Sequence, residues 1–192
     1  MTKSNRFLSA RLIAAFSTIA FGTPLAAETL ACEATLASGS IAHLSATHAT
    51  VDTSILIDAP VEEVWATLTN FEEMPTWSTS TLQSMSGDIR DGGSVTITFI
   101  FGVDENGAPN IMEIPHTLIF EDGKKFGWSD PFSEDIGGGH DNHIYQVEAC
   151  GMQTRFVQSD EIVGNPYAAN FAAQLMPMYQ TFNSELKNAV EN

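Results

Sequence analysis

Residues 57–65 read IDAPVEEVW, and within them the hydrophobic period changes from that of a strand to that of a helix. Asp58 is a residue type that caps helices, and Pro60 suits the first helical turn, where its missing N–H costs no hydrogen bond. Two glutamates follow at the end of the helix where the dipole is positive. The apolar residues from Val61 to Leu68 then recur at helical spacing. A strand followed at once by a helix is therefore predicted.

Further strands are expected on both sides of this junction. Before it, Val51, Thr53 and Ile55 share one face of a strand. After it comes a second short helical turn at residues 71–75, ended by a proline. A series of segments with a period of two follows, separated by turn residues. These strands are expected near residues 82–85, 95–101, 112–120, 126–128, 143–147 and 152–163.

The C-terminal segment changes to a period of three to four residues. Asn165 and Pro166 are suited to open a helix there. Pro177 lies inside this helix and is expected to kink it, because proline lacks an N–H and its ring clashes with the preceding turn. The apolar face of this long amphipathic helix comprises Phe171, Leu175, Met178, Phe182, Leu186 and Val190.

The stretch 57–65 resembles the opening signature of the SRPBCC superfamily, also called START-like or polyketide cyclase/dehydrase and lipid-transport proteins. Residues 74–77, 143–148, 154–156 and 182–187 are similar to later landmarks of that family. The resemblance implies an α+β helix-grip fold, in which a curved antiparallel seven-stranded sheet wraps around a long C-terminal helix and two short helices follow the first strand. We therefore expect one SRPBCC/START-like domain over residues 51–192.

The first 27 residues are typical of a secretory signal peptide. Three bases precede an apolar run from Leu12 to Phe21, and small residues close the segment at Ala27. This run is too short to cross a ~30 Å hydrocarbon core as a helix. We expect residues 1–27 to be removed by cleavage near Ala27, which makes the chain periplasmic or secreted.

Residues 28–50 are rich in Ala, Ser and Thr and have no clean period, so we expect a flexible lead-in. Cys32 and Cys150 both remain after cleavage, and an even number of cysteines in an oxidising compartment favours a disulfide. Lipid attachment is an alternative for Cys32, because residues 29–32 weakly resemble a lipobox. The sequence leaves the pairing open.

The charge of the chain limits its partners. It holds 24 acidic and 8 basic residues, a formal net charge of −16. Loss of the three leader bases leaves five bases against 24 acids, a formal charge of −19. No group of bases forms a patch that could follow phosphates, so a nucleic-acid partner is not expected. Anionic lipid headgroups repel such a chain, and stable membrane insertion is not expected. The oligomeric state stays open.

His116 is the most informative polar residue for function. Strand alternation places it on one face with Met112, Ile114, Leu118 and Phe120, so its ring is expected to point inward. A neutral imidazole there orients a ligand carbonyl or hydroxyl, or acts as a general base. The alternative is a core histidine that a backbone group satisfies.

Five further residues are candidates for a ligand-binding role. His143 and Tyr145 share a strand face and bring an imidazole and a phenol beside apolar walls. Trp128 and Phe99 are strand aromatics that either fill a core or line a cavity. Met178 lies next to the internal proline, where an adaptable side chain shapes the cavity mouth. Packing alone is the alternative for each.

No cofactor, metal or catalytic residue is assigned from the sequence. It holds no Gly-x-Ser-x-Gly elbow, phosphate loop or dinucleotide fingerprint. His140 and His143 are three residues apart, and on a strand they point to opposite faces. No third imidazole or cysteine pair accompanies them at a familiar spacing, so a metal site is not expected.

Three functions are compatible with these observations. The first is an exported binding or carrier protein for an apolar small molecule, a lipid or an aromatic polyketide-like compound, held in a cavity under the C-terminal helix. The second is an enzyme of cyclase, dehydratase or hydrolase type that uses His116 or His143 for proton transfer. The third is an interaction module whose acidic face binds a basic partner.

Overall fold

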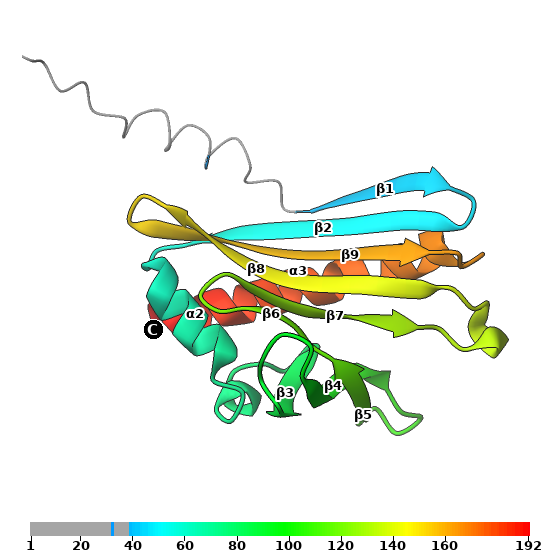
Figure 1. Ribbon diagram of the computed structural model, residues 1–192, viewed down its shortest axis with the longest axis horizontal. Coiled ribbons are helices and arrows are strands. Elements are labelled where there is room, and N and C mark those ends of the chain that lie inside the picture. The colour runs from blue at the N-terminus through cyan, green and yellow to red at the C-terminus, as the bar shows by residue number, and fades with distance from the viewer. Residues whose placement is uncertain (1–31, 33–38) are drawn as a thin grey trace, which may run out of the picture.

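The computed structural model describes Cys32 and residues 39–192, so the expected signal peptide lies outside the described residues. Strands dominate this part of the chain (Figure 1). The elements in chain order are β1 (Ser40–Ser45), β2 (His48–Ile57), α2 (Val61–Thr69), η1 (Met74–Thr76), β3 (Leu82–Gly87), β4 (Ser94–Val103), β5 (Pro109–Thr117), β6 (Ile119–Glu121), β7 (Lys125–Pro131), η2 (Glu134–Ile136), β8 (His140–Cys150), β9 (Gln153–Val163) and α3 (Ala168–Glu191).

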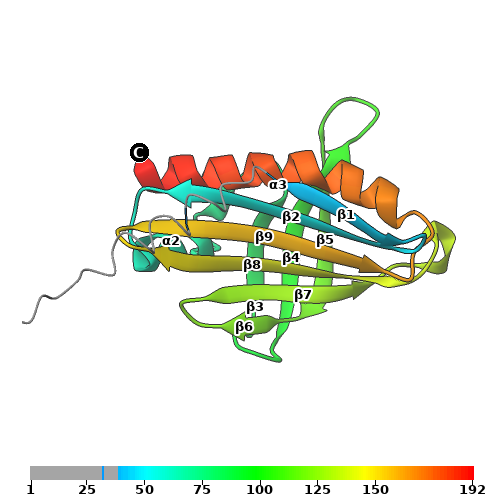
Figure 2. The same ribbon diagram turned by 90° about the horizontal axis from the view of Figure 1, so that it is seen from above.

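The strands form two antiparallel sheets around the terminal helix. The larger sheet has the order β1-β2-β9-β8-β7-β6, and the smaller has the order β3-β4-β5. Figures 1 and 2 show α3 lying along the larger sheet, and in Figure 1 the smaller sheet lies on the other side of the helix from β2. The expected α+β helix-grip fold, including the short helices after the first long strand, is confirmed.

The number of strands differs from the expected seven, because the structure describes nine in two sheets. The strand expected over residues 112–120 is divided at Leu118 into β5 and β6. The N–H of Leu118 donates to the carbonyl of Gly93, and its own carbonyl accepts from the N–H of Gly92. The chain thus bends between the two sheets at Leu118, and the backbone N–H and carbonyl of this residue are both hydrogen-bonded. The bend gives the strands a curvature that one flat sheet would lack.

The flexible lead-in expected over residues 28–50 is wrong for residues 40–50, which lie in two paired strands and the turn between them. Residues 40–45 and 48–57 form the β1–β2 hairpin, in which Ile41 lies opposite Val51. Ala, Ser and Thr side chains differ little in hydrophobicity, so the sequence shows no clear alternation here. Backbone pairing with β2 nevertheless holds these residues in a strand. Ile41 also packs against the core cluster that contains Val51 and Tyr179.

The terminal helix begins at Ala168, three residues after its expected opening. Asn165 instead forms hydrogen bonds with the end of η2 and the segment between η2 and β8. Its side chain donates to the carbonyls of Ile136 and Gly138, at 3.0 and 2.7 Å, and accepts from the N–H of Tyr167. The helix continues through Pro177 as one element.

A disulfide between Cys32 and Cys150 closes the question that the sequence leaves open. Cys150 ends β8, at the turn into β9, and the two Cα atoms are 6.1 Å apart. The bond joins the segment ahead of β1 to the β8–β9 hairpin, across 118 residues of chain.

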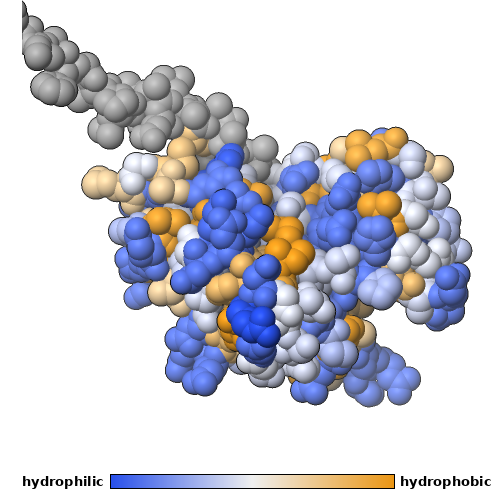
Figure 3. Space-filling view, in the orientation of Figure 1, coloured by the Kyte–Doolittle hydropathy of each residue, from blue (hydrophilic) through white to orange (hydrophobic). Residues whose placement is uncertain are grey.

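The core lies between the sheets and the two helices. Its aromatic side chains include Trp65 of α2, Phe126 of β7 and Phe182 of α3. On the face drawn in Figure 3, hydrophilic side chains prevail and apolar ones show in small, separate places. No helix of the described residues is long and apolar enough to span a membrane.

Candidate functional site

A cavity of about 570 Å³ lies between the smaller sheet, strands β7 and β8, and the first half of α3. Its volume is within the range of small-molecule sites. Each of these elements contributes large side chains to its wall. The apolar lining includes Phe99, Ile100, Met112, Ile114, Phe171 and Leu175.

One end of the cavity is acidic. Asp130 of β7 lies directly opposite Asp141 of β8 in the strand register, and both line the cavity. The N–H of Asp130 donates to a carboxylate oxygen of Asp141 at 3.2 Å. On the next strand Asp160 lies opposite His143 and is buried. Adjacent strands of one sheet therefore bring three carboxyl groups to one place.

His143 lies inside a stack of rings next to these carboxyl groups. Its centroid is 4.6 Å from that of Tyr145 and 4.7 Å from that of Tyr179. The Trp128 ring lies edge-to-face with it at 5.0 Å between centroids. Gln158 Nε2 donates to His143 Nε2 at 2.9 Å. Burial, followed by repulsion from His116, lowers the pKa of His143 to about 3, so the ring is neutral near pH 7.

Burial raises the pKa of the neighbouring carboxyl groups, whereas it lowers that of the imidazole. Burial, followed by repulsion from Asp160 and Asp130, raises the pKa of Asp141 to about 8. Burial also raises the pKa of Asp160 to about 6, although the hydrogen bond from Tyr179 lowers it. Burial raises the pKa of the Tyr179 phenol, which stays protonated and acts as the donor. The acidic end thus holds both protonated and ionised groups near neutral pH.

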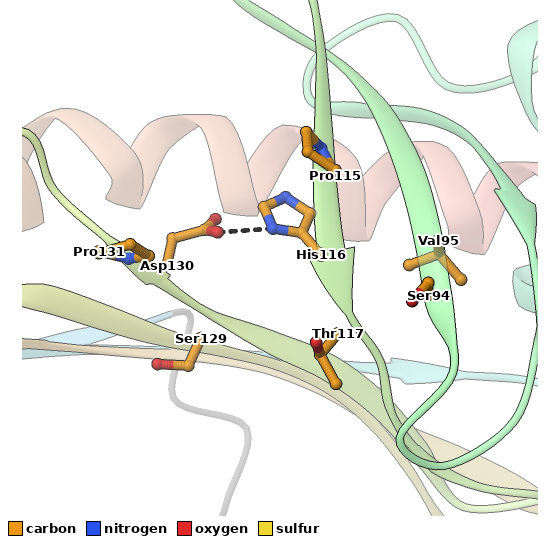
Figure 4. Close-up of a pocket in the computed structure, with 8 residues that line it drawn as sticks. All are labelled: Ser94, Val95, Pro115, His116, Thr117, Ser129, Asp130 and Pro131. Atoms are coloured by element: carbon orange, nitrogen blue, oxygen red, sulfur yellow. Dashed lines mark ion pairs between the residues drawn. The ribbon is translucent and has the colours of Figure 1, made fainter.

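His116 points inward as expected, but it does not line the main cavity. It lines an adjoining recess of about 390 Å³ together with Asp130 (Figure 4). Its Nδ1 lies 2.5 Å from Asp130 Oδ1, and its ring stacks on Trp128 at 5.4 Å between centroids. Its Nε2 is buried without a hydrogen-bond partner. Asp130 borders both hollows, so the His116–Asp130 pair stands between them.

The structure brings five of the six expected site residues together. His143, Tyr145, Trp128, Phe99 and Met178 all line the main cavity. They come from β8, β7, β4 and α3, and only the fold makes them neighbours.

Sequence reasoning missed the aspartates and Tyr179. Asp141 is two residues before His143 on the same strand, so alternation places it on the same inward face. The face of Asp160 is ambiguous from sequence, because apolar residues occupy both faces of β9. Tyr179 directly follows the predicted Met178 on the helix, and its hydroxyl donates to Asp160 at 2.7 Å.

Within Cys32 and residues 39–192, no three His, Cys, Asp or Glu side chains are arranged so that they could hold a metal ion. What the cavity offers chemically is an apolar enclosure with carboxyl, phenol and imidazole groups at one end. Such an arrangement orients a bound molecule through one polar group.

Residues 48–191 match the family described as polyketide cyclase / dehydrase and lipid transport. The chain belongs to this family. Members of the SRPBCC superfamily share the sheet and terminal helix described above, which confirms the resemblance noted in the sequence. A comparison with curated proteins found no match.

Solved structures share the fold of this polyketide cyclase/dehydrase family member at low identity. The di-domain ARO/CYC BexL from the BE-7585A biosynthetic pathway aligns with a TM-score of 0.60 and 8% identity, over 78% of this chain and 52% of that one. Ara h 8.0201 aligns at 0.55 and 14%, over 74% and 97%. Protein NE0264 from Nitrosomonas europaea aligns at 0.55 and 15%, over 74% and 94%. These likenesses concern the fold alone.

Proposed function

We propose that this protein binds and carries an apolar small molecule in the cavity beneath α3, without converting it. The observation that supports the proposal is the cavity itself, about 570 Å³ with mostly apolar walls and polar groups gathered at one end. Burying apolar ligand surface contributes about 25 cal/mol per Å², so such walls supply affinity while the polar end sets orientation.

A cavity-filling substitution tests this proposal. Ile114 lines the cavity from β5, and Ile111 lies on the other face of the same strand with 61% of its surface exposed. We expect the neutral fluorescent probe N-phenyl-1-naphthylamine to bind the wild-type chain saturably. Ile114→Trp should abolish this binding, and Ile111→Trp should retain it.

The melting temperature of each variant provides the control for folding. Binding that does not saturate, or Ile114→Trp binding the probe as tightly as the wild type does, would contradict the proposal. If the proposal holds, native mass spectrometry of the wild-type chain purified from its own host should show the mass of the protein with a co-purified small molecule bound.

The geometry gives the catalytic alternative less support. His143 is neutral, a weak base because of its lowered pKa, and its Nε2 accepts from Gln158. His116 is paired with Asp130 and faces the adjoining recess rather than the cavity. The imidazole that lines the cavity is thus too weak a base for a proton shuttle near neutral pH, and the other imidazole does not line the cavity.

We also propose that the carrier acts outside the cytoplasm, in the periplasm or as a secreted protein. Two observations support this: the leader pattern of residues 1–27 and the disulfide Cys32–Cys150, which persists in oxidising compartments. The intact mass of the exported chain should correspond to cleavage near Ala27. A chain that keeps its leader and stays in the cytoplasm would contradict the proposal.

A further inference from the structure

The acidic end of the cavity lacks compensating charge. Asp130 has His116 as its partner, and Asp141 accepts one backbone N–H. Asp160 accepts from Tyr179 at one oxygen, while its Oδ1 is buried with no hydrogen-bond partner although only 2% of the residue is exposed. Buried carboxylates are normally paired with cations or fully hydrogen-bonded, so this arrangement is incomplete.

The basic side chains of the described residues do not complete it. All five lysines and arginines of residues 39–192 pair with acids elsewhere in the fold. The pairs are Arg90–Asp88, Lys124–Glu121, Lys125–Glu121, Arg155–Glu148 and Lys187–Glu191. Two imidazoles lie at the cluster: that of His116 pairs with Asp130, and that of His143, opposite Asp160, is neutral. Within Cys32 and residues 39–192 no lysine or arginine supplies positive charge at this end, so a bound cation can supply it.

Aromatic side chains line the cavity together with these acids. Trp128, Tyr145 and Tyr179 line the cavity beside Asp130 and Asp141. Ring faces attract cations, most strongly when water is excluded. The combination of carboxylates and ring faces suits a cationic group and disfavours an anionic one.

We propose that the molecule carried in this cavity has a protonated amine, which the Asp130–Asp141 end binds, on an aromatic or aliphatic body that fills the apolar part. This inference rests on the proposed carrier function and adds the class of ligand. The ammonium group supplies donors to Asp130 and Asp141, which line the cavity, and its positive charge favours their ionised forms. Molecules that end in a carboxylate are excluded, because the same end repels them. The formal charge of −16 also draws cations toward the protein.

Three probes of similar size and different charge test the ligand class. They are 1-naphthylmethylamine, 1-naphthylmethanol and 1-naphthoate, which are cationic, neutral and anionic near neutral pH. Isothermal titration calorimetry should show the amine binding the wild-type chain at least about tenfold more tightly than the alcohol, as a charge-assisted hydrogen bond predicts. The carboxylate should bind most weakly. The advantage of the amine should persist in about 0.5 M NaCl, because buried pairs are screened less than surface charge.

Two variants locate the effect, and one serves as a matched control. Asp141→Asn keeps the acceptor for the N–H of Asp130 but cannot ionise against the ammonium group, so the amine should lose its advantage while the affinity for the alcohol changes less than about twofold. Asp160→Asn, which keeps an acceptor for Tyr179, should weaken amine binding in the same direction. Asp52→Asn removes an equal charge from an exposed position of β2 and should change neither affinity.

The outcomes separate this inference from the proposed function. Equal affinity for amine and alcohol, or an amine advantage that survives Asp141→Asn, overturns the amine assignment while binding of N-phenyl-1-naphthylamine still supports a carrier. Failure of N-phenyl-1-naphthylamine and of all three naphthyl probes to bind overturns the carrier function and the amine assignment together.

Discussion

The hydroxyl of Tyr179 on α3 donates a hydrogen bond of 2.7 Å to Asp160 Oδ2 on β9. This bond ties the terminal helix to the larger sheet at the acidic end of the cavity, and both residues are buried. It is also one of the few interactions that favour the ionised form of Asp160, against the burial that disfavours it.

Tyr179→Phe therefore removes a donor from a buried carboxyl group. We expect the free energy of unfolding in urea to fall by about 1–3 kcal/mol. The pKa of Asp160, followed by carbon-13 NMR, should rise further, because the hydrogen bond that lowers it is lost. Asp160→Asn made in the Tyr179→Phe background should lessen the loss of stability. An unchanged pKa of Asp160 would show that the bond does not form in solution.

Asp141 makes stability depend on pH. Its pKa is raised to about 8 in the folded chain, so the folded state keeps a proton that the unfolded state has lost. Its contribution to stability is present at low pH and lost as pH rises through about 8. Below about pH 6.5 His143 acts in the opposite direction, because it stays neutral in the folded chain and becomes protonated in the unfolded one. The free energy of unfolding should thus fall from about pH 6.5 to about pH 8.

Asp141→Asn isolates this effect. The difference in slope between wild type and variant should approach about 1.4 kcal/mol per pH unit over that interval, the value for one proton. Urea titrations at several pH values provide the measurement. Asp52→Asn, on an exposed position of the same sheet, should keep the wild-type slope. Parallel curves for wild type and Asp141→Asn would show that Asp141 titrates normally.

His116 has a structural role in the pair with Asp130. His116→Phe keeps a ring to stack on Trp128 but leaves Asp130 without its partner. We expect a loss of about 1–3 kcal/mol in the free energy of unfolding, less than for a fully buried pair because Asp130 is 24% exposed. The double variant His116→Phe/Asp130→Asn should recover part of it. A double variant no more stable than the single one would speak against the ion pair.

The disulfide contributes to stability by restricting the unfolded chain. It closes a loop of 118 residues, and removal of a native disulfide costs about 2–5 kcal/mol. Cys32→Ser/Cys150→Ser should lower the melting temperature to that of the reduced wild type. A reductant should leave the double variant unchanged. Equal melting of oxidised and reduced wild type would mean that the bond stabilises nothing.

Strong periodicity explains what the sequence predicted well. The face of α3 that holds Phe182 and Leu186, and the inward faces of β8 and β4, carry large apolar side chains at regular spacing. Alternation alone was sufficient to place His143 and Tyr145 together. Large residues in regular patterns leave few ways to bury their surface, so the element and its buried face follow directly.

Other features depend on the backbone and on neighbouring strands. The bend at Leu118 arises from hydrogen bonds to Gly92 and Gly93, which no local pattern reveals. β1 forms because the edge of β2 is available for pairing. The separation of His116 from the main cavity depends on where β7 places Asp130, a relation between strands that alternation within one strand does not contain.

The bond between Cys32 and Cys150 also sets an order of events in biogenesis. Because a chain is synthesised from its N-terminus, Cys32 emerges 118 residues ahead of its partner. Strands β1 to β7 and nearly all of β8 have to follow before the two thiols can meet. Until then Cys32 can pair only with a thiol of another molecule. Formation of the native disulfide is therefore a late step, which requires that the chain has emerged at least to the end of β8.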